Sequence, residues 1–156
     1  MYQPGWAVSR DQMAVYVSRC LAGGDANVPA GSGAVMFPDM PADYWASKYV
    51  EFAMMNGVVQ GYDDGYHPVE EVDRAQMAVF VARGMAAAGG PSLDTYTPPA
   101  TQTFPDVGTD HWAYQYVEYI ADPSRAVTLG YPDGLYHPEV IVTRDQMAVY
   151  MQRAFE

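Results

Sequence analysis

The sequence has little positive charge and a single cysteine. Its 156 residues include eight lysines and arginines against nineteen aspartates and glutamates, a formal net charge of −11. Nucleic acids and anionic membrane surfaces attract basic proteins, so this balance argues against both as partners. Cys20 has no second cysteine for an internal disulfide, and the redox compartment is therefore left open.

Long apolar runs and catalytic arrangements are also missing. No run is long enough to cross a bilayer, so we expect no membrane insertion. The N-terminus has no signal-peptide pattern, and we expect any export signal to lie outside these residues. Without a nucleophile–base pair or a phosphate-binding glycine loop, no enzyme activity and no cofactor are expected. His67 and His137 lack a second ligand at metal-binding spacing, so no metal site is expected.

One motif occurs three times in the sequence. Its copies are residues 8–19, 72–83 and 142–153. Each copy opens with a side chain that can cap a helix, followed three residues later by a glutamine that completes a capping box. We therefore predict three helices, which begin at Arg10, Arg74 and Arg144. Apolar residues recur on one face of each, so the three faces should share one core around Met13, Met77 and Met147.

Arginine recurs at two positions of this motif. An arginine in the first turn of a helix opposes the helix dipole by about 0.3–1 kcal/mol, so these three arginines call for a compensating partner. That partner is either an internal carboxylate such as Asp39 or Asp106, or an anionic ligand. The second set, Arg19, Arg83 and Arg153, follows an aromatic residue, which favours stacking or a surface helix pair over a binding site.

Two complete units surround the later motif copies. Each opens with a phenylalanine and, eight residues later, a tryptophan: Phe37 and Trp45, then Phe104 and Trp112. Asp43 and Asp110 are predicted to cap the helices that follow. Each tryptophan then lies on the apolar face of its helix, where it either packs in the core or serves as a platform for a sugar ring. A turn with Asp-Gly follows, at residues 61–66 and 130–136, and its pattern favours a plain turn over a calcium loop.

These motifs together resemble the S-layer homology family of cell-envelope anchoring repeats. The resemblance divides the chain into a half repeat and two complete repeats with linkers between them: residues 1–22, linker 23–36, repeat 37–88, linker 89–103 and repeat 104–156. The glutamate that usually ends the family's Thr-Arg-Ala-Glu motif is replaced by Gln12, Gln76 and Gln146, which preserves capping but removes three charges.

The resemblance implies an all-α, pseudo-threefold bundle of helix–turn–helix repeats. It implies an extracellular module on the bacterial cell surface or wall that binds a secondary cell-wall polysaccharide, often acidic and pyruvylated, in grooves between repeats. The family's ligand-contacting arginine, tryptophan and turn glycine map onto Arg10, Arg74, Arg144, Trp45, Trp112, Gly61 and Gly130.

The missing half of the first repeat leaves a second interpretation open. At least one groove cannot be complete within these residues, and the first motif helix would lack a covering helix. A stripe that includes Val15, Tyr16 and Trp6 would then be exposed, and soluble monomers rarely tolerate such a patch. A protein partner or self-association would cover it, which would make the chain a structural assembly subunit of a surface layer or filament.

Overall fold

The computed structural model describes all 156 residues and contains five α-helices joined by long loops. The helices are α1 (Arg10–Ala22), α2 (Ser47–Met55), α3 (Arg74–Ala87), α4 (Tyr114–Ala121) and α5 (Arg144–Phe155), with a 3₁₀ helix, η1, at Asp25–Asn27. Strand-like pairing is limited to isolated bridges, so the all-α prediction is confirmed. We find no helix with both the length and the apolar character needed to cross a membrane.

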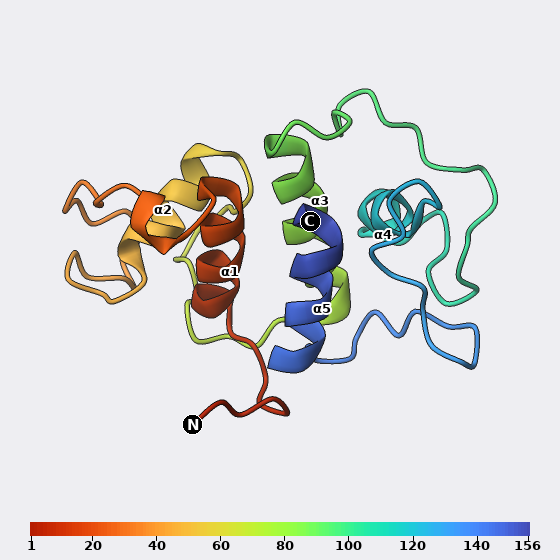
Figure 1. Ribbon diagram of the computed structural model, residues 1–156, viewed down its shortest axis with the longest axis horizontal. Coiled ribbons are helices and arrows are strands. Elements are labelled where there is room, and N and C mark those ends of the chain that lie inside the picture. Colours follow the sequence, from red (N-terminus) through yellow and green to blue (C-terminus); the bar gives the residue numbers. More distant parts are fainter.

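The three motif helices form the centre of the molecule, as predicted. Each begins at its predicted arginine, and all three capping boxes are present. Helices α1, α3 and α5 contact one another in pairs (Figure 1). Met13, Met77 and Met147 are fully buried in one continuous core, so the prediction of a shared core is confirmed.

A ring of backbone hydrogen bonds joins the residues just before these helices. The amide of Val8 donates to the carbonyl of Val142, that of Val142 to Val72, and that of Val72 to Val8, each at 2.9 Å. All three valines are fully buried, so each bond satisfies groups that water cannot reach. The ring ties together three segments that lie far apart in the sequence.

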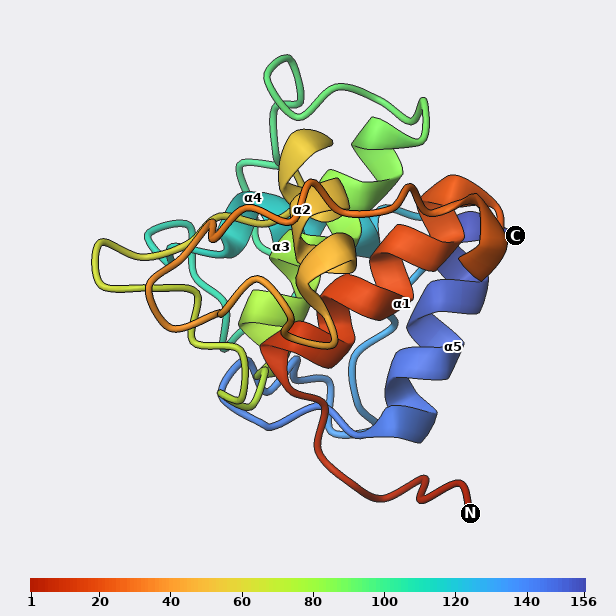
Figure 2. The ribbon, with the colours of Figure 1, turned by 90° about the vertical axis from the view of Figure 1, so that its left-hand side faces the viewer.

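Helices α2 and α4 each cover one motif helix from outside. Helix α2 packs on α1 and α4 packs on α3 (Figure 1), so each covers the motif helix of the preceding repeat. The open face predicted on α1 is therefore wrong for Val15, which α2 shields and which is 6 % exposed, although Trp6 is 59 % exposed as expected. Helix α5 is the one without a cover and lies at the edge of the molecule (Figure 2); its Val149 is 42 % exposed, against 9 % for the equivalent Val79 of α3.

The helices α2 and α4 begin later than predicted. Their N-caps are Ala46 and Ala113, so the prediction that Asp43 and Asp110 cap them is wrong. Each tryptophan precedes its helix and is exposed, with 57 % of Trp45 and 62 % of Trp112 accessible. The fully buried alanine that follows takes the inward position in both cases. Core packing of the tryptophans is therefore excluded.

Candidate functional site

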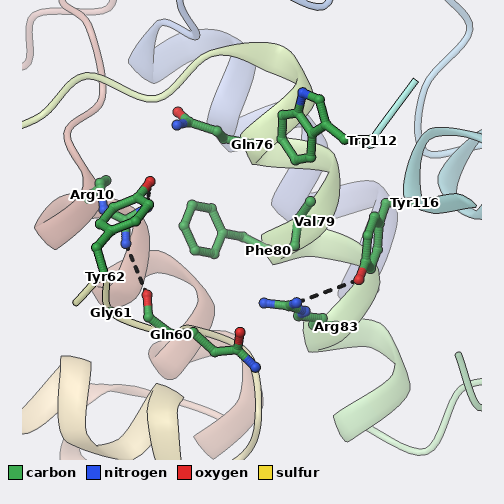
Figure 3. A pocket seen from close by; sticks show the side chains of 10 residues that line it. All are labelled: Arg10, Gln60, Gly61, Tyr62, Gln76, Val79, Phe80, Arg83, Trp112 and Tyr116. Carbon is green, nitrogen blue, oxygen red and sulfur yellow. Dashed lines mark hydrogen bonds between the residues drawn. The ribbon is translucent and has the colours of Figure 1, made fainter. Parts of the chain in front are cut away.

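A groove of about 570 Å³ lies where three repeats meet. Arg10 of α1 and the turn at residues 60–62 line one side of it, and Trp112 and Tyr116 line the other (Figure 3). Four side chains of α3 lie between them, with Phe80 pointing into the middle of the view. The groove brings together three of the predicted site residues, Arg10, Gly61 and Trp112.

Arg10 is held by neutral groups. Its Nε donates to the carbonyl of Tyr66 at 2.8 Å, and its Nη2 to the carbonyl of Gln60 at 3.1 Å. Its Nη1 donates to the hydroxyl of Tyr62 at 3.3 Å. The side chain is 4 % exposed, yet no carboxylate lies within ion-pair distance of its guanidinium. Of the two partners expected for Arg10, the internal carboxylate is therefore wrong, because backbone carbonyls orient the cation instead.

Aromatic faces complete the surroundings of this cation. The guanidinium carbon of Arg10 lies 4.7 Å from the ring centre of Tyr62, 4.8 Å from that of Tyr66 and 5.6 Å from that of Phe80. The hydroxyl of Tyr66 donates back to the carbonyl of Arg10 at 3.1 Å. Such contacts fix the guanidinium without neutralising its charge, so an anion in the groove would still be attracted.

Asp39, one predicted partner of the arginines, binds the backbone. Its carboxylate accepts hydrogen bonds from the amides of Tyr66 at 2.8 Å and His67 at 2.7 Å. Burial raises the pKa of Asp39, but these amide bonds outweigh it and lower the pKa below its ordinary value. Asp106 makes the same two bonds in the third repeat. Both carboxylates therefore hold the Asp-Gly turn in place.

The opposite wall carries a second cation. Arg83 lies 5.5 Å from the ring centre of Tyr116, and its Nη2 donates to the hydroxyl of Tyr116 at 3.5 Å (Figure 3). Arg83 thus packs on an aromatic ring, but the ring belongs to Tyr116 of α4 and not to the aromatic residue three positions earlier, Phe80. The prediction that favoured stacking over a binding site did not anticipate that Arg83 lines the groove. No carboxylate pairs with it either. The groove thus combines two cations without carboxylate partners and several aromatic faces.

The turn glycines have a packing role. A Cβ on Gly61 would lie 2.1 Å from Cε1 of Phe37, and one on Gly130 would lie 2.5 Å from Cε1 of Phe104. Both are far inside normal contact distance, so only glycine lets the phenylalanine ring pack on the turn.

Arg74 makes the same contacts to its turn as Arg10 does, but it has no opposite wall of tryptophan and tyrosine. Its Nε donates to the carbonyl of Tyr136 at 2.7 Å, and the hydroxyl of Tyr136 donates back to the carbonyl of Arg74 at 2.8 Å. Tyr131, which follows Gly130 in the turn, lies 4.7 Å from the guanidinium. Tyr150 of α5 takes the place of Phe80 and accepts a hydrogen bond from Arg74. No helix of this structure packs on α5 as α4 packs on α3, so Arg74 has no counterparts of Trp112 and Tyr116 beside it.

Arg144 and Trp45 lie in the third, least complete copy of this arrangement. The guanidinium of Arg144 lies 5.3 Å from the ring centre of Trp6, and no Gly-Tyr turn accompanies it. Trp45 lies beside Tyr44, with 6.1 Å between ring centres, and α1 carries Arg19 over Tyr49 in the manner of Arg83 over Tyr116. Of the predicted site residues, Arg10, Gly61 and Trp112 therefore line the groove, whereas Arg74, Arg144, Trp45 and Gly130 lie outside it.

Several groove residues were not predicted as site residues from the sequence. Tyr62 recurs as Tyr131 in the Gly-Tyr pair, and Phe80 recurs as the aromatic Tyr150, so recurrence alone was a usable signal for them. Tyr116 recurs as Tyr49, so the same signal applied to it, although only the packing of α4 on α3 brings it to the groove.

Comparison with known proteins gives a consistent assignment. The family model described as "S-layer homology domain" matches residues 37–78 and 103–148, more than half of the chain. The chain is similar to cell surface glycoprotein 1 of Acetivibrio thermocellus, with 27 % identity over 99 % of the chain and 7 % of the relative. It is also similar to the cellulosome-anchoring protein of the same organism, with 24 % identity over 100 % of the chain and 34 % of the relative.

A third relative matches a shorter segment. S-layer protein EA1 of Bacillus anthracis is 36 % identical over 35 % of the chain and 6 % of its own length. The chain thus spans about a third or less of the length of each of these relatives. The family model matches most of both complete repeats, which line the groove together with Arg10. The chain therefore belongs to the S-layer homology domain family.

Proposed function

We propose that the chain is a non-catalytic anchoring module that binds an anionic secondary cell-wall polysaccharide in the groove between Arg10 and Trp112. Relatives named as a cellulosome-anchoring protein and as an S-layer protein support an anchoring role. The same names support an extracellular location, on the bacterial cell surface or in the cell wall.

The observation that carries the proposal is the pair of cations in the groove. The chain has a net charge of −11, yet Arg10 and Arg83 both line this groove without carboxylate partners. A guanidinium binds a carboxylate through two parallel hydrogen bonds, which suits an acidic sugar. Trp112, Tyr62 and Tyr116 add flat apolar surfaces on which the C–H face of a sugar ring can pack.

The proposal includes a pseudo-threefold arrangement of the three repeats at residues 1–22, 37–88 and 104–156. The cyclic hydrogen bonds of Val8, Val72 and Val142 support it, since equivalent atoms bond in the same order around the ring. The equivalent surroundings of Arg10 and Arg74 support it as well. On this arrangement the grooves at Arg74 and Arg144 are incomplete versions of the one at Arg10.

The two tryptophans provide the test. Trp112→Ala removes one wall of the groove. Trp45→Ala removes a similarly exposed tryptophan that does not line this groove. In sedimentation with purified wall sacculi, we expect Trp112→Ala to weaken binding about tenfold, roughly 1.4 kcal/mol, and Trp45→Ala to leave it unchanged. Equal effects of the two substitutions, or no binding by the parent chain, would contradict the proposal.

One observation favours a second function, that of an assembly subunit. The exposed face of α5 is where a further protein segment would bind. A chain that assembles with other proteins but does not sediment with sacculi would support this alternative.

A further inference from the structure

His67 packs on a residue that lines the groove. Its ring centre lies 4.9 Å from that of Tyr62, and the two rings are inclined at 45°. Tyr62 lines the groove, and its ring also lies against the guanidinium of Arg10 (Figure 3). His67 is not itself one of the lining residues. It therefore reaches the groove through its contact with Tyr62.

Both ring nitrogens of His67 lie against carboxylates. Nε2 is 2.9 Å from Oδ1 of Asp64, and Nδ1 is 3.3 Å from Oε2 of Glu70. An ionised carboxylate only accepts hydrogen bonds, so the two contacts together need a hydrogen on each nitrogen. A neutral imidazole carries one hydrogen and the protonated ring carries two. Only protonated His67 can therefore bind both carboxylates.

The two carboxylates connect different parts of the groove wall. Asp64 lies in the Asp-Gly turn, two residues after Tyr62. Glu70 lies beyond the turn, and its backbone carbonyl accepts a hydrogen bond from the amide of Arg10 at 2.9 Å. Protonated His67 thus ties the part of the turn that carries Tyr62 to the segment that holds the start of α1. This link keeps Tyr62 and Arg10 in a fixed relative position.

The backbone at His67 is held independently of its ring. Its φ of 59° lies in the left-handed region, where histidine occurs more often than most residues with a side chain. Its amide donates to Oδ2 of Asp39 at 2.7 Å. The two side-chain carboxylates therefore determine the direction of the ring, and the backbone does not move with it.

The counterpart of His67 in the last repeat lacks the second carboxylate. Nε2 of His137 lies 2.6 Å from Oδ2 of Asp133, and its ring packs edge-on against Tyr131 at 5.0 Å. Val140 takes the place of Glu70. Neither His137 nor Tyr131 lines the groove. His137 is therefore a matched control for a role of His67 in the groove.

The remaining histidine packs on the opposite wall. The ring of His111 stacks on that of Trp112 with 5.7 Å between centres, and its Nδ1 accepts a hydrogen bond from the amide of Ala113 at 3.1 Å. Protonation at Nδ1 would remove this bond, so His111 gives the groove a pH response of its own. The effect of His67 must therefore be measured against a variant that keeps His111.

We propose that His67 is a positioning residue of the groove: its protonated ring, bound to Asp64 and Glu70, holds Tyr62 in place for the polysaccharide and makes wall binding sensitive to pH. This inference rests on the proposed function. The other charged groups around the two rings belong to arginine or to carboxylic acids, which ordinarily titrate above about 12 or near about 4. These groups are Arg10, Asp39, Asp64 and Glu70. Histidine is thus the group here that changes charge near neutral pH.

The direction of the pH effect follows from the contacts of His67. The hydrogen bond to Asp64 is the main reason that the pKa of His67 lies above its ordinary value, Glu70 adds to it, and burial opposes it. The protonated ring is therefore fully present below the ordinary pKa of about 6.5 and is lost as pH rises through the folded pKa. Wall binding that depends on this ring should weaken over the same interval.

The test is sedimentation with purified wall sacculi between about pH 6 and about pH 9, on either side of the ordinary pKa of histidine. At the lower pH we expect the parent chain to bind about threefold more tightly than His67→Gln, a modest ratio because Asp64 and Glu70 are exposed. At the higher pH the two affinities should be equal. His137→Gln should behave as the parent chain does at both pH values.

Two glutamates separate positioning from simple attraction of an anion by a charged histidine. Glu70→Ala and Glu71→Ala each remove one negative charge from neighbouring exposed positions, but only Glu70 contacts His67. Positioning predicts that Glu70→Ala weakens wall binding at the lower pH and that Glu71→Ala does not. Attraction by charge alone predicts that neither substitution weakens it, because both make the surroundings of the groove more positive.

Four results would overturn the proposal. These are a parent to His67→Gln affinity ratio that does not change with pH, an equal loss in His137→Gln, no loss in Glu70→Ala, and a His67 ring that NMR shows to titrate at or below the ordinary pKa of about 6.5. Failure of the parent chain to sediment at either pH would instead overturn the proposed function. The NMR titration uses the free protein, so it tests the link between His67 and its two carboxylates in that case as well.

Discussion

Substituting leucine for one alanine at the equivalent position of α1, α3 and α5 tests which of these helix faces are covered. Ala14 and Ala78 are fully buried on the faces that pack against α2 and α4. Ala148 holds the same position on α5 and is exposed. One chemical change is thus compared at three equivalent positions, with helix propensity nearly constant because alanine and leucine are both strong helix formers.

The expected magnitudes follow from the space at each position. Leucine adds three carbon atoms, and extra methylenes in a closely packed interior cost about 1–3 kcal/mol, because neighbours must leave their preferred positions. We expect that cost for Ala14→Leu and Ala78→Leu. A substitution on an open surface changes the free energy of unfolding by about 0.5 kcal/mol or less, so Ala148→Leu should be nearly neutral.

Urea unfolding followed by circular dichroism measures these free energies by linear extrapolation. For a chain of this size, each 1 kcal/mol corresponds to about 2–4 °C in Tm, so the buried substitutions should lower Tm by about 2–12 °C. Ala148→Leu as costly as Ala14→Leu would show that the face of α5 is covered in the free chain. Neutral substitution at all three positions would refute the packing of α2 on α1 and of α4 on α3.

Two further predictions concern the turns that line the grooves. Asp39→Asn should cost about 1 kcal/mol at neutral pH, since it weakens two hydrogen bonds to turn amides. Folding lowers the pKa of Asp39, so its carboxylate stabilises the fold above the ordinary pKa of about 3.9, and this stabilisation is lost as pH falls through the folded pKa. The difference in stability between the parent chain and Asp39→Asn should therefore shrink in acid. Asp63→Asn, at an exposed position in the same turn, is the control, and an equal effect there would contradict this role. Gly61→Ala should cost about 1–3 kcal/mol in urea unfolding, because its Cβ meets the ring of Phe37, and Gly5→Ala, with no atom within 4 Å, should be neutral; equal stabilities would show that the ring moves freely.

The sequence by itself determined the three motif helices and their common core. The capping residues Ser9, Asp73 and Thr143 define where the helices begin, because they satisfy amides that have no partner within a helix. Local chemistry of this kind is independent of the rest of the fold. The periodic apolar residues then require the three helices to share an interior, so the all-α class followed from the sequence as well.

The tertiary structure decided what surrounds each arginine and tryptophan. The sequence offered carboxylates as partners for Arg10, but the groups that bind it are the backbone carbonyls of Gln60 and Tyr66. Because every residue carries a backbone carbonyl, no residue type identifies these partners in the sequence. The outward direction of Trp112 depends on the neighbouring Ala113, which fits the close approach to the core better than a large ring does. Neither outcome has a residue-type pattern that predicts it.

The position of the open face was likewise decided by packing. The repeat boundaries suggest that each opening helix covers the motif helix of its own repeat, yet α2 covers α1 and α4 covers α3. Long connections allow either pairing, and only the fit of complementary faces selects one, as Tyr44 does by reaching Asp11. The exposed face therefore lies on α5, at the C-terminal end of the chain, and not on α1.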